Sequence, residues 1–277
     1  MDEWIQVSRD LMIALVGGLV GAAGGAWGAQ AIAESSARRK ERLTELRNVN
    51  ALIQLSGSAC NIALGYRKQF SIELLDNLKT ERKKFDETKR STQRFKEEYH
   101  LKMNLLRFPI PSIPIMRMEE ILFSRISSTG RELSIMQQIE LSLQGLVEAS
   151  NERSKLVEMF SSNSIEKSVA PYMYLGVRQP DGTTDQSYPS LVEALDTYAQ
   201  DVAFFTHMLC SDLVAYGGRL RKKIIEESSF FDGSVPRVSE IDFSSAQANG
   251  LLPSSEGYES WLAGFTEHSS DADQKPR

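Results

Sequence analysis

Hydrophobic residues along this 277-residue chain follow two patterns, and both predict helices. Residues 11–33 (LMIALVGGLVGAAGGAWGAQAIA) form one uncharged run. Residues 43–64, 127–160 and 190–224 instead place apolar side chains three or four positions apart, which is typical of helices that bury one face. Together the patterns predict an all-α fold, in which an N-terminal transmembrane helix continues into an elongated cytoplasmic helical bundle or coiled coil, followed by an irregular C-terminal tail.

These patterns divide the chain into four predicted parts. They are an outer N-terminal segment (1–10), a transmembrane helix (11–33), a cytoplasmic helical bundle (34–227) and an irregular C-terminal tail (228–277). Residues 35–108 contain no proline, so we expect helix to leave the membrane almost without interruption.

Prolines, glycines and small residues mark the expected breaks in the bundle. The prolines within residues 109–114 end the first long helix, because proline lacks an amide donor and restrains the residue before it. Residues 171–177 and the Asp-Gly pair after them predict an irregular loop or a small hairpin. Ser190, with Glu193 three residues later, predicts the N-cap of the most regular helix. The small residues at 56–59 indicate either a close helix contact or a kink.

The uncharged run is long enough to cross a bilayer. About 23 residues extend roughly 35 Å, against a hydrocarbon core of about 30 Å. The Ala31-Ile32-Ala33 sequence is also typical of a signal-peptide cleavage site before Glu34, because small residues stand at its first and third positions. The positive-inside bias nevertheless favours a retained span with an outer N-terminus, because the basic residues that set topology follow the run: Arg38, Arg39, Lys40 and Arg42. A cleaved signal peptide and a soluble glycine-rich helix stay open as alternatives.

Small residues within the run predict that copies of the chain associate with one another. Gly17, Gly21 and Gly25 recur every four residues, Gly18 belongs to a parallel row of small residues, and Gly28 completes the predicted oligomerisation face. Such rows let helix backbones approach closely where lipid provides no hydrophobic drive for association. We therefore expect a homo-oligomer in contact with membrane lipids.

Charge and cysteine content argue against several classes of protein. The formal net charge is −5, so the chain as a whole has no electrostatic attraction to nucleic acid. The basic residues between 79 and 90 are interleaved with acidic ones, which is typical of a solvated helix surface. Cys60 and Cys210 lie far apart without metal or redox spacing and are expected to be buried thiols in a reducing compartment.

Candidate catalytic chemistry is sparse in the sequence. The histidines, His100, His207 and His268, are scattered, and His207 with Cys210 supplies too few ligands for a zinc site. We therefore expect no catalytic, cofactor-binding or metal-binding residue, no small-molecule substrate and no enzyme activity. Arg94 and His100 have an R-x5-H spacing that resembles the paired motif of HEPN ribonucleases, which are all-helical proteins. That resemblance implies ribonuclease activity as an alternative function.

The C-terminal tail contains one cluster of large apolar residues: Tyr258, Trp261, Leu262 and Phe265. Their spacing predicts a short amphipathic turn that docks on the bundle, on a neighbouring subunit or on a cytoplasmic protein partner. The residues after 267 are polar, which is typical of disorder.

The first part of the chain resembles uncharacterised bacterial single-pass inner-membrane proteins that have a glycine-zipper helix and a cytoplasmic helical body. Two motifs carry this resemblance: G-x-x-x-G-x-x-x-G-x-W-G-A-Q-x-I-A-E-S-S from Gly17 to Ser36, and L-x-E-L-R-N-V-N at 43–50. The resemblance implies a bacterial inner-membrane location and transfers no active residue. We expect a non-enzymatic, membrane-anchored oligomer that acts as a scaffold or interaction platform. An effector that perturbs the membrane when triggered, for example in bacterial defence, stays open as an alternative.

Overall fold

Every regular element in the described part of the chain is a helix, which confirms the all-α prediction. The computed structural model describes residues 2–91, 100–127, 130–162, 164–227 and 235–266, with side chains from Gly25 onward except Ala26, Arg90 and Ser91. In chain order the elements are α1 (Asp2–Tyr66), the π-helix η1 (Arg67–Ser71), α2 (Ile72–Ser91), α3 (Ile115–Arg125), α4 (Glu132–Ser161), α5 (Ala170–Leu175), α6 (Ser187–Glu226), α7 (Ser244–Ala248) and α8 (Glu259–Thr266).

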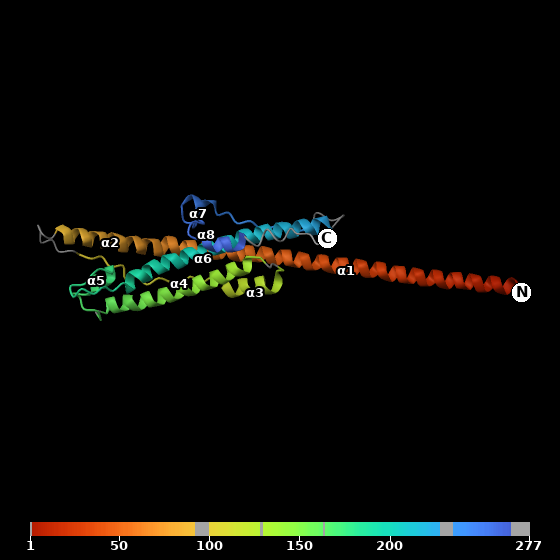
Figure 1. The fold of residues 1–277 in the computed structure, drawn as a ribbon, viewed down its shortest axis with the longest axis horizontal. Coiled ribbons are helices and arrows are strands. Elements are labelled where there is room, and N and C mark those ends of the chain that lie inside the picture. Colours follow the sequence, from red (N-terminus) through yellow and green to blue (C-terminus); the bar gives the residue numbers. More distant parts are fainter. Residues whose placement is uncertain (1, 92–99, 128–129, 163, 228–234, 267–277) are drawn as a thin grey trace.

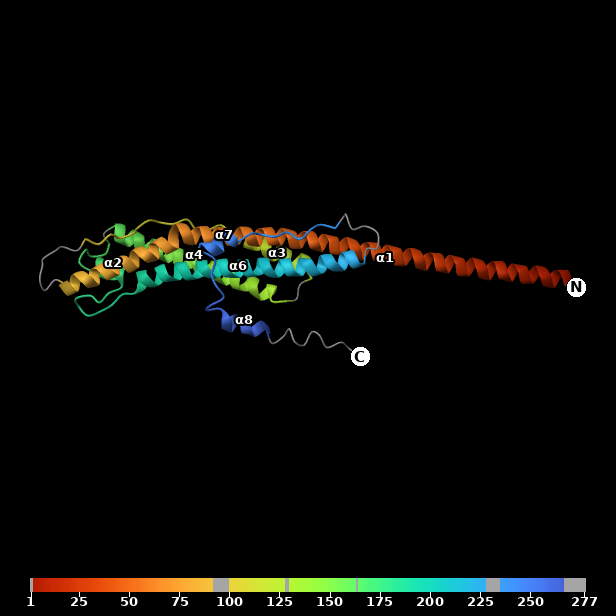
Figure 2. The ribbon, with the colours of Figure 1, turned by 90° about the horizontal axis from the view of Figure 1, so that it is seen from above.

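Helices α1, η1 and α2 follow one another without a break and form a rod along the long axis of the molecule (Figure 1). Helices α4 and α6 lie beside the second half of this rod, and α6 packs against both α1 and α4. The first half of α1 projects beyond the other helices, as both Figure 1 and Figure 2 show. The molecule is therefore an elongated helical bundle from which one helix extends.

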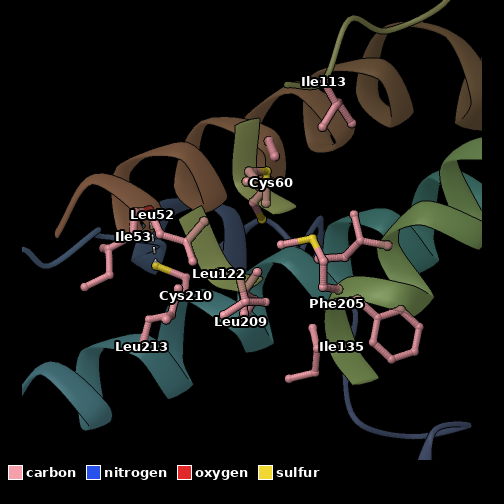
Figure 3. Packing of buried hydrophobic residues seen from close by; sticks show 14 of the residues in the cluster. Leu52, Ile53, Cys60, Ile113, Leu122, Ile135, Phe205, Leu209, Cys210 and Leu213 are labelled. Carbon is pink, nitrogen blue, oxygen red and sulfur yellow. Dashed lines mark hydrogen bonds between the residues drawn. The ribbon is translucent and has the colours of Figure 1, made fainter. Parts of the chain in front are cut away.

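The core lies where α1, α3, α4 and α6 meet. Figure 3 shows Leu52 and Cys60 of α1 near Leu209 of α6, with Leu122 of α3 and Ile135 of α4 beside them. Each of these side chains is at most 1% exposed, and burying an aliphatic side chain of this size contributes roughly 1.5–3 kcal/mol. The predicted apolar face of the first long helix is confirmed by the burial of Leu46, Val49, Ile53, Cys60, Ala63 and Leu64.

The predicted transmembrane helix lies mostly outside the residues whose side chains the structure describes, since these begin at Gly25. Within the described part of the chain, no helix combines the length and the apolar character that a membrane crossing requires.

Two local predictions in the second half of the chain are wrong. Residues 170–175 form helix α5 rather than a loop or hairpin, because Pro171 stands in the first turn, where a helix tolerates proline. Helix α6 begins at Ser187, so Ser190 lies inside the helix and does not cap it. Asp185 accepts a hydrogen bond from the Ser187 amide at 2.8 Å instead. The tight turn expected at Asp181-Gly182 is present, and the Gly182 amide donates to the Gln179 carbonyl at 3.0 Å.

Helix is absent at the prolines of 109–114, as predicted, but residues 100–108 are not helical either, so the prolines do not end the first long helix. The whole proline-rich segment, residues 100–114, runs along the bundle before α3. It is held by Arg153 of α4, which donates to the carbonyls of Leu106 at 2.8 Å and Asn104 at 3.0 Å. The Tyr174 hydroxyl accepts a hydrogen bond from the Asn104 amide at 2.8 Å. Side chains from two helices therefore satisfy backbone groups that have no helical partner in this segment.

The chain after α6 returns along the bundle as a segment that we name the C-terminal strap, residues 235–266. Asn50 of α1 donates to the Arg237 carbonyl at 2.8 Å and accepts from the Ser239 amide at 2.9 Å. A Cβ added to Gly57 of α1 would lie 2.8 Å from Cγ1 of Ile241. The small residues at 56–59 thus provide a close contact for the strap, and α1 stays helical through them.

Two adjacent glycines of α6 test this packing. A Cβ on Gly217 would lie 3.1 Å from Val49 of α1 and 3.2 Å from Val238 of the strap, whereas a Cβ on Gly218 meets nothing within 4 Å. We expect Gly217→Leu to lower the free energy of unfolding by about 1–3 kcal/mol through overpacking. We expect Gly218→Leu to raise it by up to about 1 kcal/mol through helix propensity. Urea denaturation in detergent measures both, and equal effects would contradict the close contact.

Candidate functional site

The exposed part of α1 is the first component of the candidate site. Gly25 and residues 27–38 are all exposed, and they include Trp27 at 81% and Ile32 at 70%. No other described segment of the chain covers this stretch. A helix that leaves large apolar side chains uncovered in this way is typical of a surface that contacts lipid or another protein.

The predicted oligomerisation glycines fall on both sides of the described boundary. Gly17, Gly18 and Gly21 lie outside the residues whose side chains the structure describes. Gly25 and Gly28 lie on the exposed part of α1, and a Cβ on either would meet nothing within 4 Å. The space beside these two glycines is therefore open to a second helix. Their role in association stays a prediction.

The basic residues after the apolar run are arranged around α1 at the point where it enters the bundle. Arg38 is 4.0 Å from Glu34 on its own helix, and its side chain is 65% exposed. Arg42 forms an ion pair with Glu227, just beyond the end of α6. Lys40 is exposed and Arg39 is half-buried. Whether the four residues set membrane topology stays a prediction.

A groove opens between this part of α1 and the end of α3. Its volume is about 950 Å³, which lies within the range of small-molecule sites in proteins. It is lined by Ala37, Arg38, Lys40, Glu41, Arg42, Thr44, Glu45 and Asn48 from α1, and by Phe123, Ser124, Arg125, Ile126 and Ser127 from α3 and the residues after it. Sequence reasoning found the basic residues but missed the groove, because α3 is distant in the chain.

Glu45 holds the far wall of this groove in place. Its carboxylate accepts hydrogen bonds from the Ser127 amide at 2.6 Å and from the Tyr216 hydroxyl at 2.5 Å. Burial and the hydrogen bond to Glu45 raise the pKa of Tyr216 above its usual value, so Tyr216 stays protonated and continues to donate. The end of α3, the entry of α1 and the last part of α6 are thereby joined through one carboxylate.

The predicted docking residues of the tail lie on and beside α8. Tyr258 stacks on Phe204 of α6 with ring centroids 3.7 Å apart, and its hydroxyl donates to Asp201 at 2.6 Å. Trp261 packs edge-on against Phe205 at 5.0 Å and also contacts Phe265. Leu262 is half-buried. Tyr258 and Trp261 therefore dock on their own bundle, and a further partner for the exposed side of α8 stays a prediction.

A buried ion pair joins the rod, α6 and the strap at the π-helix. Arg67 of η1 contacts Asp196 of α6 with both Nε, at 3.2 Å, and Nη2, at 3.4 Å, and its Nη1 donates to the Leu251 carbonyl at 2.9 Å. Ser71 donates to the same aspartate at 2.7 Å. The sequence contains a signal for this buried ion pair. Arg67 occupies a position where the spacing of Leu64 and Leu74 predicts an apolar residue.

A second buried cation, Arg153, lies among aromatic rings. It is 2% exposed and forms no ion pair within the described part of the chain. Its guanidinium lies 4.7 Å from the ring centroid of Phe108 and 5.6 Å from that of Tyr188. Carbonyl oxygens and aromatic faces therefore compensate its charge, and this arrangement explains its role in holding the proline-rich segment.

Candidate catalytic residues do not come together in the described structure. His207 is half-buried against the Phe243 ring, with centroids 4.9 Å apart, and burial lowers its pKa. Among the described residues no group of three His, Cys, Asp or Glu side chains could hold a metal ion. His100 is exposed, and its predicted ribonuclease partner Arg94, like His268, lies outside the described residues.

Comparisons of the chain with protein-family models, with curated proteins and with solved structures find no match. The functional interpretation therefore depends on the chain's own residues.

The buried ion pair can be tested with a double-mutant cycle. Arg67 and Asp196 have side chains 11% and 15% exposed, so Arg67→Met leaves a poorly solvated carboxylate. We expect a loss of about 3 kcal/mol in the free energy of unfolding, with partial recovery when Asp196→Leu is added. The control is Arg107→Met, which breaks an exposed pair with Glu158 and should cost less than about 1 kcal/mol. Equal losses in urea denaturation would contradict the role of the buried pair.

The two thiols should be inert in the folded protein. Cys60 and Cys210 are 0% and 2% exposed, and burial raises their pKa values to about 12 and about 11. Because the thiolate is the reactive form, we expect negligible alkylation by iodoacetamide at pH 8 and rapid labelling of both thiols after unfolding. Labelling can be counted by mass spectrometry. Rapid alkylation of either thiol in the folded protein would show that the core opens or that the thiol is activated.

Proposed function

We propose that the protein is a non-enzymatic, membrane-anchored oligomer that acts as a scaffold or interaction platform. In this proposal residues 11–33 span a bacterial inner membrane and associate through their glycine face, and the helical bundle lies in the cytoplasm. The observation that supports it best is the exposed stretch of α1, in which Trp27 and Ile32 project from the bundle with no cover from the described chain.

An uncovered apolar helix requires an apolar environment. Lipid satisfies this need for the large side chains, at roughly 25 cal/mol for each Å² removed from water. Lipid does not favour helix association, so rows of glycine gain their advantage from close contact with another helix. The open space beside Gly25 and Gly28 is compatible with such a contact.

The continuity of α1 supports a role in alignment. The helix runs from Asp2 to Tyr66 without interruption and enters the core at Leu46. Packing of the glycine faces would therefore determine how neighbouring bundles are placed relative to one another. Aligned copies would present repeated surfaces, such as the exposed side of α8, to a cytoplasmic protein partner.

Crosslinking in intact membranes tests the proposal. We expect a lysine-reactive crosslinker to trap multimers of the full-length chain, and Gly21→Leu or Gly25→Leu to reduce the multimer fraction severalfold by separating the helices. Ala23→Leu is the matched control. It makes the same kind of enlargement at a position about 200° around the helix from Gly21.

The outcomes separate the alternatives. A monomer that persists at every crosslinker concentration would overturn the oligomer, and full-length protein in the soluble fraction would overturn the membrane anchor. Leucine favours insertion more than glycine does, so loss of multimers cannot be ascribed to a failed span. A fall in membrane potential after induction would favour the membrane-perturbing alternative instead.

A further inference from the structure

Helix α8 lies on the outside of the bundle, and a small aromatic contact attaches it there. Figure 2 shows α8 outside the other helices, at the end of the segment that follows α7. Within α8, Trp261, Leu262 and Phe265 are half-buried, whereas residues 259–260 and 263–264 are exposed. The apolar side of α8 is therefore only partly covered by its own bundle.

The contact covers two aromatic rings of α6. Phe204 and Phe205 are 5% and 4% exposed. Tyr258 stacks on Phe204 and meets Phe205 edge-on at 5.5 Å, and Trp261 packs against Phe205 as well. The Tyr258 hydroxyl adds a hydrogen bond to Asp201. Removal of α8 would uncover parts of both rings, so this surface of α6 requires an aromatic occupant of the same chemistry.

The link between α7 and α8 is held at its start and open at its end. Arg67 donates to the Leu251 carbonyl at 2.9 Å. Residues 254–257 are exposed, and Gly257 has a φ of 93° with nothing within 4 Å of an added Cβ. Glycine adopts this backbone conformation and many others at little cost. Helix α8 can therefore turn about the link while Leu251 stays in place.

The reach of the link includes a second bundle. Leu252 and Tyr258 are six residues apart, so the link between them extends to about 20 Å at most. Packed helices lie about 8–10 Å apart, so α8 can reach α6 of a second copy that turns the same face toward it. In the proposed membrane-anchored oligomer, copies of α1 lie at one depth, which places equivalent sites at equal heights. The contacts made there are those seen within one chain.

Exchange between facing copies would add cover that a single chain does not provide. An α8 that lies between two bundles has protein on both sides, so more of Leu262 and Phe265 is removed from water. The stack of Tyr258 on Phe204 within one chain is nearly face to face, with ring planes 6° apart. Aromatic pairs favour this arrangement less than an offset one, so the contact within one chain is one that α8 can give up.

We propose that the Phe204–Phe205 surface of α6 is a docking site for α8 of a second copy, and that neighbouring subunits exchange this helix. Reciprocal exchange requires the two α6 faces to be turned toward each other, as in a two-fold pair. The inference rests on the proposed oligomer and adds to it a cytoplasmic contact between subunits. In a chain without a neighbour, its own α8 occupies the site.

Thiol crosslinking in membranes tests the exchange. Thr197 lies one turn before Asp201 on α6, Ser260 lies on α8, and both are exposed. The native thiols are buried, so introduced thiols react first. One tagged full-length copy carries Thr197→Cys, and a second copy with a different tag carries Ser260→Cys. We expect a short bismaleimide to join the two tags, and an absence of joined tags would overturn the exchange.

Dilution separates exchange from mere proximity of two subunits. A copy that carries both Thr197→Cys and Ser260→Cys is expressed with a tenfold excess of unmodified chain, and mass spectrometry measures the crosslinked fraction. Under exchange, α8 of this copy docks mainly on neighbours without thiols, so the fraction should fall about tenfold. A fraction that dilution does not change would overturn the exchange, because α8 would then dock within its own chain.

The matched control lies on the part of the C-terminal strap that is held closely. Ser58 and Glu240 are exposed and stand next to Gly57 and Ile241, which are in close contact. The crosslinked fraction of Ser58→Cys/Glu240→Cys should not change with dilution. An equal fall in both pairs would overturn the assignment of the exchange to α8, because the whole strap would then move.

Trp261→Ala separates the docking of α8 from oligomerisation. It removes the ring that packs against Phe205 but leaves the glycine face intact, so we expect a severalfold loss of the crosslink between positions 197 and 260 with unchanged multimers. An unchanged crosslink would contradict docking through Trp261. If multimers form while the crosslinked fraction is independent of dilution, only the exchange is wrong. If the unmodified chain forms no multimers, the proposed function and the exchange fail together.

Discussion

The apolar face of α1 from Leu46 to Leu64 packs against α6 with side chains that are almost all fully buried. This interface orients the rest of the molecule. Because α1 is one uninterrupted helix, the part that is buried in the bundle determines the direction of the part that projects from it. Because α6 also packs on α4, the same interface places the loop before α4, and with it the end of α3, beside the entry of α1.

Polar groups inside the bundle determine how its less regular parts attach. Arg67 and Asp196 connect the π-helix to α6 and to the strap carbonyl of Leu251, while Arg153 holds the proline-rich segment through two carbonyls. Neither cation adds much to the net free energy of folding, because removing a charge from water costs several kcal/mol, which its partners must first offset. Their contribution is directional, because a hydrogen-bonded guanidinium specifies one register for a segment that lacks helical structure.

The proposed oligomerisation face and the groove between α1 and the end of α3 lie near one another but differ in chemistry. The glycine face offers bare backbone to another helix, whereas the groove is lined by charged side chains of both signs. Both are uncovered by the described chain, whereas the aromatic cluster of the tail is covered by α6.

The sequence by itself determined the features that depend on local spacing. Apolar residues at helical intervals predicted the buried faces of α1, α4 and α6, and the prolines at 109–114 predicted a non-helical stretch, although helix is already absent at residue 100. The start of α6 was predicted wrongly because contacts outside the helix place its first residue at Ser187: the Gln186 side chain donates to the Gly176 carbonyl, and Asp185 accepts from the Ser187 amide.

Contacts between distant segments were decided only by the tertiary structure. The groove requires α3 to end beside Glu45, and the strap requires Gly57 and Asn50 of α1 to face residues that follow α6. The local spacing of residues does not determine these contacts, because they depend on how several helices pack together. Arg67 and Arg153 stand on otherwise apolar helix faces, but their burial was not predicted from the sequence. Their partners are determined by the tertiary structure, because packing of the helices brings Asp196 close to Arg67 and the Asn104 carbonyl close to Arg153.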